Sequence, residues 1–160
     1  MIWNNPPKFI AVPTPPGKKV TPEALAKSGT EDGSQMALFA WAASAVPIYP
    51  QLKWLFAIPN GGSRHIAEAT KMVATGLRRG VPDVFLPAQA PKHPPESEVW
   101  YNGCWIELKI EKKRNTKNDG CSQEQVDWIE YLTAAGYYCK VCYSWTEARD
   151  TLINYLEGKL

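Results

Sequence analysis

Two acids and one lysine interrupt apolar stretches in the middle of this sequence. Asp83 directly follows a Gly-Val-Pro turn, and Glu107 and Lys109 lie two residues apart in the run Trp-Ile-Glu-Leu-Lys-Ile. Residues two apart in a β-strand point to the same face, with backbones about 7 Å apart. Side chains so placed are close enough to share one ion and one water molecule. Charged groups in the middle of a sheet are costly to bury unless they are paired or bound to a metal.

Two chemical interpretations fit these three residues. The first is a cross-strand salt bridge between Lys109 and either Asp83 or Glu107. The second is metal-dependent hydrolysis of a phosphodiester, because two carboxylates suit a hard Mg²⁺ or Mn²⁺ ion that keeps waters and takes phosphate oxygens as ligands. Such an ion polarises the phosphate and lowers the pKa of a bound water. Lys109 would then orient or help to deprotonate that water, and would offset developing negative charge.

The elements that must position these residues alternate between helices and strands. Apolar periodicity, capping residues and turn signals predict the order α-β-α-β-β-α-β-α. The expected bounds are helix 31–45, strand 53–58, helix 63–75, strand 83–86, strand 100–110, helix 122–136, strand 137–143 and helix 144–156. Ser122 and Gln125 form a capping-box signature, and residues 87–95 are rich in proline and predict a loop. This order predicts an α/β fold, a mixed central sheet flanked by helices.

Several short motifs together resemble one known family. They are GVPD at 80–83, IELK at 106–109 and SQEQ at 122–125, in this order, with an Asn60-Gly61 turn upstream. In this combination they resemble the virus-type replication-repair nuclease (VRR-NUC) domain, a branch of the PD-(D/E)xK nuclease superfamily. The resemblance covers about residues 30–156. It implies a restriction-endonuclease-like core and a metal-dependent deoxyribonuclease.

The resemblance also implies roles for individual residues. Four would bind Mg²⁺ or Mn²⁺: Asp83, Glu107, the backbone carbonyl of Leu108, and Glu31. The catalytic set would be Asp83, Glu107, Lys109 and Gln125. Gln125 has an alternative role as the partner of Ser122 in the capping box. Acids are also ordinary in a first helical turn, so Asp32 and Gln35 compete with Glu31 for its assignment.

A local excess of positive charge suggests a polyanionic partner. The net charge is only +2, but residues 109–117 contain five cations and one acid. Eight basic residues would border the expected cleft and contact DNA phosphates: Arg64, Lys71, Arg78, Arg79, Lys112, Lys113, Arg114 and Lys117. Such contacts position a duplex without reading its sequence. The alternative for each of them is solvated surface charge.

Composition sets the remaining expectations. Residues 1–29 contain six of the fourteen prolines, which predicts an extended arm without regular helix, followed by a nuclease-like domain at 30–160. No run of apolar residues is long enough to span a membrane, and no secretory signal is recognised, so we expect a cytoplasmic protein. We also expect it to need no nucleotide cofactor. Residues 88–102 form a proline-rich insert relative to the family.

These observations together predict a small Mg²⁺- or Mn²⁺-dependent endonuclease. The resemblance implies a homodimer that cuts branched DNA such as Holliday junctions. Two alternatives stay open at this point: a flap- or restriction-like nuclease with other DNA preferences, and a non-catalytic DNA-binding domain on a nuclease fold. Intact Asp83, Glu107 and Lys109 argue against the second, because a binding module has no need of unpaired acids beside DNA phosphates.

Overall fold

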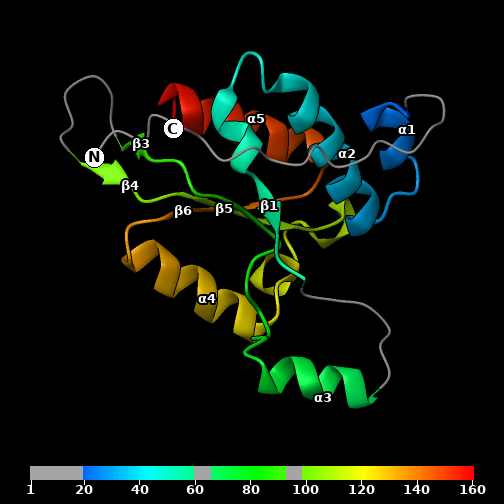
Figure 1. Cartoon of the computed structure of the whole chain (residues 1–160). Coiled ribbons are helices and arrows are strands. Elements are labelled where there is room, and N and C mark those ends of the chain that lie inside the picture. Colours follow the sequence, from blue (N-terminus) through cyan, green and yellow to red (C-terminus); the bar gives the residue numbers. More distant parts are fainter. Residues whose placement is uncertain (1–19, 60–65, 93–98) are drawn as a thin grey trace.

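The computed structural model describes residues 20–59, 66–92 and 99–160. A four-stranded sheet forms its centre, in the order β1 (Phe56–Ala57), β2 (Val84–Leu86), β5 (Cys104–Leu108) and β6 (Tyr138–Cys142). The pairs β1–β2 and β2–β5 are antiparallel, whereas β5 and β6 are parallel. Helices α2 (Glu31–Ala45) and α5 (Trp145–Glu157) cover one face, and α4 (Gln123–Ala134) lies on the other (Figure 1). The predicted mixed sheet with flanking helices is confirmed.

The two faces of strand β5 differ in composition. Cys104, Ile106 and Leu108 are buried in the apolar core with Val84 and Leu86 of β2. Because side chains alternate along a strand, the residues between them point to the opposite face, toward the α4 side. Strands β2 and β5 therefore contribute aliphatic side chains and Cys104 to the core under α2 and α5, and the charged Glu107 of β5 lies on the other face.

The main helices begin where the sequence predicts. The α2 bounds match the predicted helix 31–45, with Thr30 as N-cap accepting from the Gly33 N–H. Ser144 caps α5 in the same way through the Glu147 N–H. The α5 helix ends at Gly158, whose φ of 66° is in the left-handed region that favours glycine. Helix α3 (Ile66–Ala74) starts within the predicted helix 63–75, and residues 63–65 lie outside the described part of the chain.

Three predicted segments differ from the structure. The first two residues of the predicted strand 53–58 belong to a 3-10 helix, η1 (Pro50–Trp54), whose start Pro50 fixes with a turn-like φ, and only Phe56–Ala57 form the strand β1. The predicted strand 100–110 is two strands, β4 (Trp100–Tyr101) and β5, separated by Gly103. The loop predicted at 87–95 contains β3 (Ala90–Pro91), which pairs with β4 in a separate two-stranded sheet.

The expectation that residues 1–29 hold no regular helix is wrong for residues 22–26. Helix α1 (Pro22–Ala26) begins with Thr21 as its N-cap and Pro22 in the first turn. Proline is tolerated there because its missing N–H would have no intrahelical partner. The α1 helix packs against α2, and residues 1–19 lie outside the described part of the chain. Among the described residues, no helix combines the length and apolar character needed to cross a membrane.

A buried tyrosine on α5 anchors the connection between the two sheets. Tyr155 is fully buried, and its hydroxyl donates to the Ala88 carbonyl at 2.6 Å. Ala88 lies between β2 and β3, so this bond holds the start of the β3–β4 excursion against the core. Burial raises the pKa of Tyr155 well above its usual range, so it remains a neutral donor.

We predict that Tyr155→Phe lowers the free energy of unfolding by about 1–2 kcal/mol, because the Ala88 carbonyl loses its buried donor. Urea denaturation followed by circular dichroism measures the change. Tyr101→Phe is the matched control, since no hydrogen bond from the Tyr101 hydroxyl occurs among the described residues. Equal stability of the two variants would contradict the anchoring role.

Candidate active site

Two side chains from separate parts of the chain converge on one buried carboxylate. Glu107 is only 1% exposed, and its Oε1 accepts hydrogen bonds from the Lys109 ammonium and from the Gln125 amide. Lys109 follows the end of β5, and Gln125 lies in the first turn of α4. The salt bridge expected as one alternative therefore exists, between Lys109 and Glu107.

Gln125 makes both of the contacts that the sequence presented as alternatives. Its Oε1 accepts from the Ser122 N–H at 2.9 Å, and its own N–H donates to the Ser122 hydroxyl, which completes the capping box. Because the amide oxygen is used by the cap, the amide nitrogen faces Glu107. The cap thus fixes the orientation of the side chain that contacts the candidate active site.

Asp83 and Leu108 are joined directly across the strands. The Leu108 N–H donates to Asp83 Oδ2 at 2.9 Å, and the Asp83 carbonyl accepts from the Ile58 N–H at 2.7 Å. The N–H and C=O of one residue in an antiparallel strand face the same neighbour. We therefore expect the Leu108 carbonyl to face the Asp83 side of the strand as well.

Negative charge accumulates around Glu107. Burial first, then the charge of Asp83 and, as a smaller contribution, that of Glu31, raise the pKa of Glu107 to about 7 against the lowering effect of Lys109. Burial alone would lower the pKa of Lys109, but its bond to Glu107 and the charges of Glu107 and Glu31 outweigh burial and raise it. Glu31, at the start of α2, is thus electrostatically coupled to both residues.

We predict that stability falls as pH rises from about 4.5 to about 7 in metal-free buffer. A carboxyl whose folded pKa exceeds its unfolded value favours folding while protonated, and it loses that contribution as it ionises. The Lys109 shift acts only at higher pH. Urea denaturation of wild type and Glu107→Gln across this window measures the effect. The variant should show a shallower slope, and an unchanged slope would contradict the prediction.

A glycine fits the GVPD turn against the first turn of α4. Gly80 has a φ of 81°, and a Cβ built on it would lie 2.6 Å from the Glu124 backbone carbon. The adjacent Arg79 carbonyl accepts from Trp128 Nε1 at 2.9 Å. These two contacts hold the turn before Asp83 against the helix that carries Gln125, which explains why the two motifs belong together.

We predict that Gly80→Ala costs more stability than Gly76→Ala. Both glycines have positive φ, but a Cβ on Gly76 would meet nothing within 4 Å. Backbone strain of about 1–2 kcal/mol is common to both variants, and the clash with Glu124 adds about 1–3 kcal/mol for Gly80 alone. Equal unfolding free energies in urea would show that the close approach to α4 does not constrain position 80.

The carboxylates of Asp83 and Glu107 could bind a hard cation. Within residues 20–59, 66–92 and 99–160, no group of three or more His, Cys, Asp or Glu side chains is arranged to hold a metal. Mg²⁺, however, needs only one or two carboxylates and otherwise keeps waters. The buried Oε2 of Glu107 has no hydrogen-bond partner among the described residues. An ionised oxygen left in this way is expensive unless a cation neutralises it, so Glu107 and Asp83 fit such an ion.

The fold has a known counterpart. A solved "VRR_NUC domain protein" matches with a TM-score of 0.60 and 21% identity, over 80% of this chain and 88% of the other. The chain has the VRR_NUC fold. No protein-family model matches the sequence, and no curated protein matches it. The resemblance seen in the GVPD, IELK and SQEQ motifs therefore agrees with the three-dimensional structure.

The basic residues expected to contact DNA are spread unevenly on this VRR_NUC fold. Arg79 lines an open pocket of about 380 Å³ together with Gln125, so it lies beside the candidate active site. Lys112, Lys113 and Lys117 are exposed on the two 3-10 turns η2 (Glu111–Lys113) and η3 (Lys117–Gly120) after β5. Three others lie elsewhere: Arg78 is exposed before the GVPD turn, Lys71 is on α3, which extends away from the sheet in Figure 1, and Arg64 is outside the described residues.

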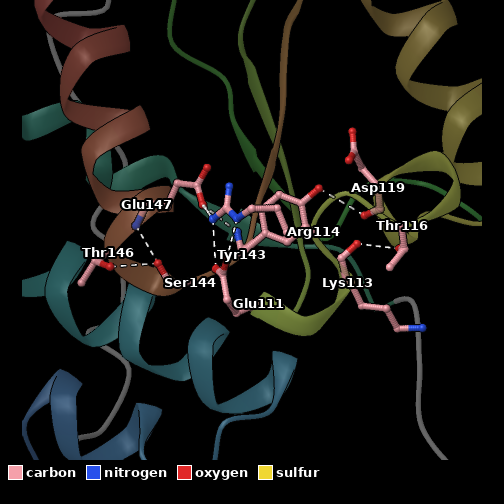
Figure 2. Close-up of polar contacts among 9 residues, drawn as sticks. All are labelled: Glu111, Lys113, Arg114, Thr116, Asp119, Tyr143, Ser144, Thr146 and Glu147. Carbon is pink, nitrogen blue, oxygen red and sulfur yellow. Dashed lines mark hydrogen bonds and ion pairs between the residues drawn. The ribbon is translucent and has the colours of Figure 1, made fainter.

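Arg114 differs from the lysines because its guanidinium is held by acids. It donates to both carboxylate oxygens of Glu111, at 2.7 and 3.0 Å, and to Glu147 at 2.9 Å. Its guanidinium also lies 4.1 Å from the ring centre of Tyr143 (Figure 2). Arg114 therefore ties the basic loop to the start of α5.

Sequence reasoning gave Tyr143 no role and gave Glu147 only a role at the start of the last helix. Besides holding Arg114, Glu147 accepts from the Tyr143 N–H at 3.0 Å, and the Tyr143 hydroxyl donates to the Asp119 carbonyl at 3.3 Å. The only signal in the sequence was the Ser144–Glu147 spacing at the start of the last helix, which indicates a capping box. The contact with Arg114 spans 33 residues and has no local sequence signature.

Proposed function

We propose that this protein is a metal-dependent, structure-specific DNA endonuclease that hydrolyses phosphodiester bonds in branched DNA such as Holliday junctions. One observation carries the proposal: the buried Glu107 has one oxygen that accepts from Lys109 and Gln125 and a second oxygen without a partner among the described residues. A purely structural salt bridge gives no reason to bury that second oxygen beside Asp83. The VRR_NUC fold and the three motifs support the same conclusion.

Mg²⁺ or Mn²⁺ would be held by Asp83, Glu107 and the Leu108 carbonyl, with Glu31 binding directly or through water. When bound, such an ion polarises the phosphate and lowers the pKa of a coordinated water. Two carboxylates with one neutral carbonyl suit a cation that retains several waters and accepts substrate phosphate oxygens. The raised pKa of Glu107 is consistent with a site whose negative charge is not fully offset by Lys109 until an ion binds.

Lys109 and Gln125 would act on the reacting atoms from the protein side. The Lys109 ammonium, 7% exposed, would orient the attacking water and offset negative charge that develops on the phosphate. Because its pKa is raised, Lys109 fits the role of a hydrogen-bond donor better than that of a base. Gln125 would keep the Glu107 carboxylate oriented and present its amide toward the substrate.

DNA phosphates on both sides of the cleaved bond would be bound by basic side chains: the exposed lysines after β5 and Arg79 beside the pocket. Arg114 would act differently, by holding the loop that carries those lysines. A homodimer would place two active sites on one branched substrate for paired incisions, and light scattering of the protein in solution measures that state.

We expect metal-dependent cleavage that depends on Lys109. A four-way junction, a flap, linear duplex and single-stranded DNA should be incubated with Mg²⁺, Mn²⁺ or EDTA. Lys109→Ala should reduce the cleavage rate by about 10²-fold or more, because a donor to the transition state is lost. Lys112→Ala is the matched control, since Lys112 is exposed, and it should change mainly the affinity.

Calorimetric titration with Mn²⁺ provides a readout independent of activity, and Asp83→Asn should weaken binding. If wild type cleaves none of the substrates yet shifts their mobility in gels, the non-catalytic DNA-binding alternative replaces this proposal. Cleavage that persists in EDTA would exclude the metal site.

A further inference from the structure

Four aromatic rings form a continuous line across the sheet. This aromatic stripe consists of Phe56, Phe85, Trp105 and Tyr137. The Phe85 and Trp105 rings are stacked with centres 4.2 Å apart, and Phe56 meets Phe85 edge-on at 5.6 Å. Tyr137 contacts both Phe85 and Trp105, at 5.9 and 6.5 Å. The stripe therefore crosses β1, β2 and β5 and reaches the residue before β6.

The aromatic stripe lies on the same face of the sheet as the candidate active site. Phe85 is two residues from Asp83, and Trp105 is two residues from Glu107, so each pair shares a face with backbones about 7 Å apart. Phe56 is the register partner of Phe85 and points to that face too. The opposite face of β2 and β5 carries aliphatic side chains and Cys104. The aromatic residues of these two strands are therefore confined to the side that carries the carboxylates.

Helices do not cover the stripe completely. Helix α4 packs against β6, and among the described helices none packs closely against β1 or β2 on this face (Figure 1). Phe56 is 44% exposed, while the other three rings are partly buried. Trp105 Nε1 is buried without an acceptor among the described residues. A partly open line of four contacting aromatic rings beside two carboxylates is more than core packing requires.

We propose that the aromatic stripe binds the unpaired bases of a single-stranded DNA segment next to the cleaved phosphodiester. Every base has a π-face, so aromatic side chains bind single strands by stacking with little dependence on sequence. A continuous duplex keeps its bases stacked inside and offers none to the stripe. This inference rests on the proposed nuclease function and ranks its branched substrates: those with an unpaired strand at the branch, such as flaps, should bind more tightly than a fully paired four-way junction.

The test measures DNA affinity without cleavage. A labelled single-stranded oligonucleotide and the duplex of the same sequence are titrated with protein in EDTA, and fluorescence anisotropy gives both dissociation constants. Phe56→Leu keeps an apolar side chain but removes the ring. It should weaken single-strand binding about fivefold or more and leave duplex binding within about twofold. Phe56→Tyr keeps the ring and should bind like wild type.

Tyr131→Leu is the matched control, because Tyr131 is 66% exposed on α4 and outside the stripe. It should bind both DNAs like wild type. Equal single-strand affinity of wild type and Phe56→Leu would overturn the proposal, as would an equal loss for single strand and duplex. A second readout uses 2-aminopurine in the oligonucleotide: wild type and Phe56→Tyr should change its fluorescence more than Phe56→Leu does, and equal changes would also overturn it.

Cleavage assays separate this inference from the proposed function. If the protein cleaves DNA in a metal-dependent way but Phe56→Leu cleaves flaps as fast as wild type, the stripe proposal fails and the nuclease proposal stands. If no substrate is cleaved in any metal, the nuclease proposal fails, and the binding measurements in EDTA still decide whether the stripe binds single strands.

Discussion

The carboxylate of Glu107 is the constraint on which the arrangement of this molecule depends. An acid that is 1% exposed in the central strand of a sheet is destabilising unless its oxygens find partners. Within the described part of the chain, Lys109 from just after the strand and Gln125 from α4 both donate to Oε1, and Oε2 has no hydrogen-bond partner. The fold therefore keeps a carboxylate whose negative charge is only partly offset at the centre of its sheet. The turn at Gly80 and the Ser122–Gln125 cap hold the residues around it in place.

Side chains of strand β5 alternate between the hydrophobic core and the candidate active site. Its even-numbered residues complete the aliphatic core beneath α2 and α5, whereas its odd-numbered residues face α4 and carry the aromatic and charged groups. A one-residue slip in register would exchange the two sets. The pairing of β5 with β2 on one side and β6 on the other fixes that register, so the core determines which side chains reach the candidate active site.

The sequence predicted the fold class and the bounds of α2 closely, because periodic apolar residues and caps are local signals. It also brought Asp83, Glu107, Lys109 and Gln125 into one candidate set, and they meet around Glu107 in the structure. It failed where non-local pairing decides the outcome. The β3–β4 pairing forms between two short segments with no pattern of their own. The strand predicted at 53–58 is shortened to β1 because the 3-10 turn η1, which begins at Pro50, takes its first two residues. The role of Arg114 was similarly hidden, since charge alone does not reveal its acidic partners.

The segment between Lys109 and Gln125 begins and ends at the same carboxylate, with Arg114 holding its middle against α5. Because the ends of this segment are held by the folded body, it behaves as a closed loop. The entropic cost of closing a loop grows only with the logarithm of its length, so adding or removing residues changes that cost little. Homologous chains can thus lengthen, shorten or recharge this segment at small thermodynamic cost. Evolution is free to diversify this basic loop while the contacts with Glu107 at its two ends stay the same.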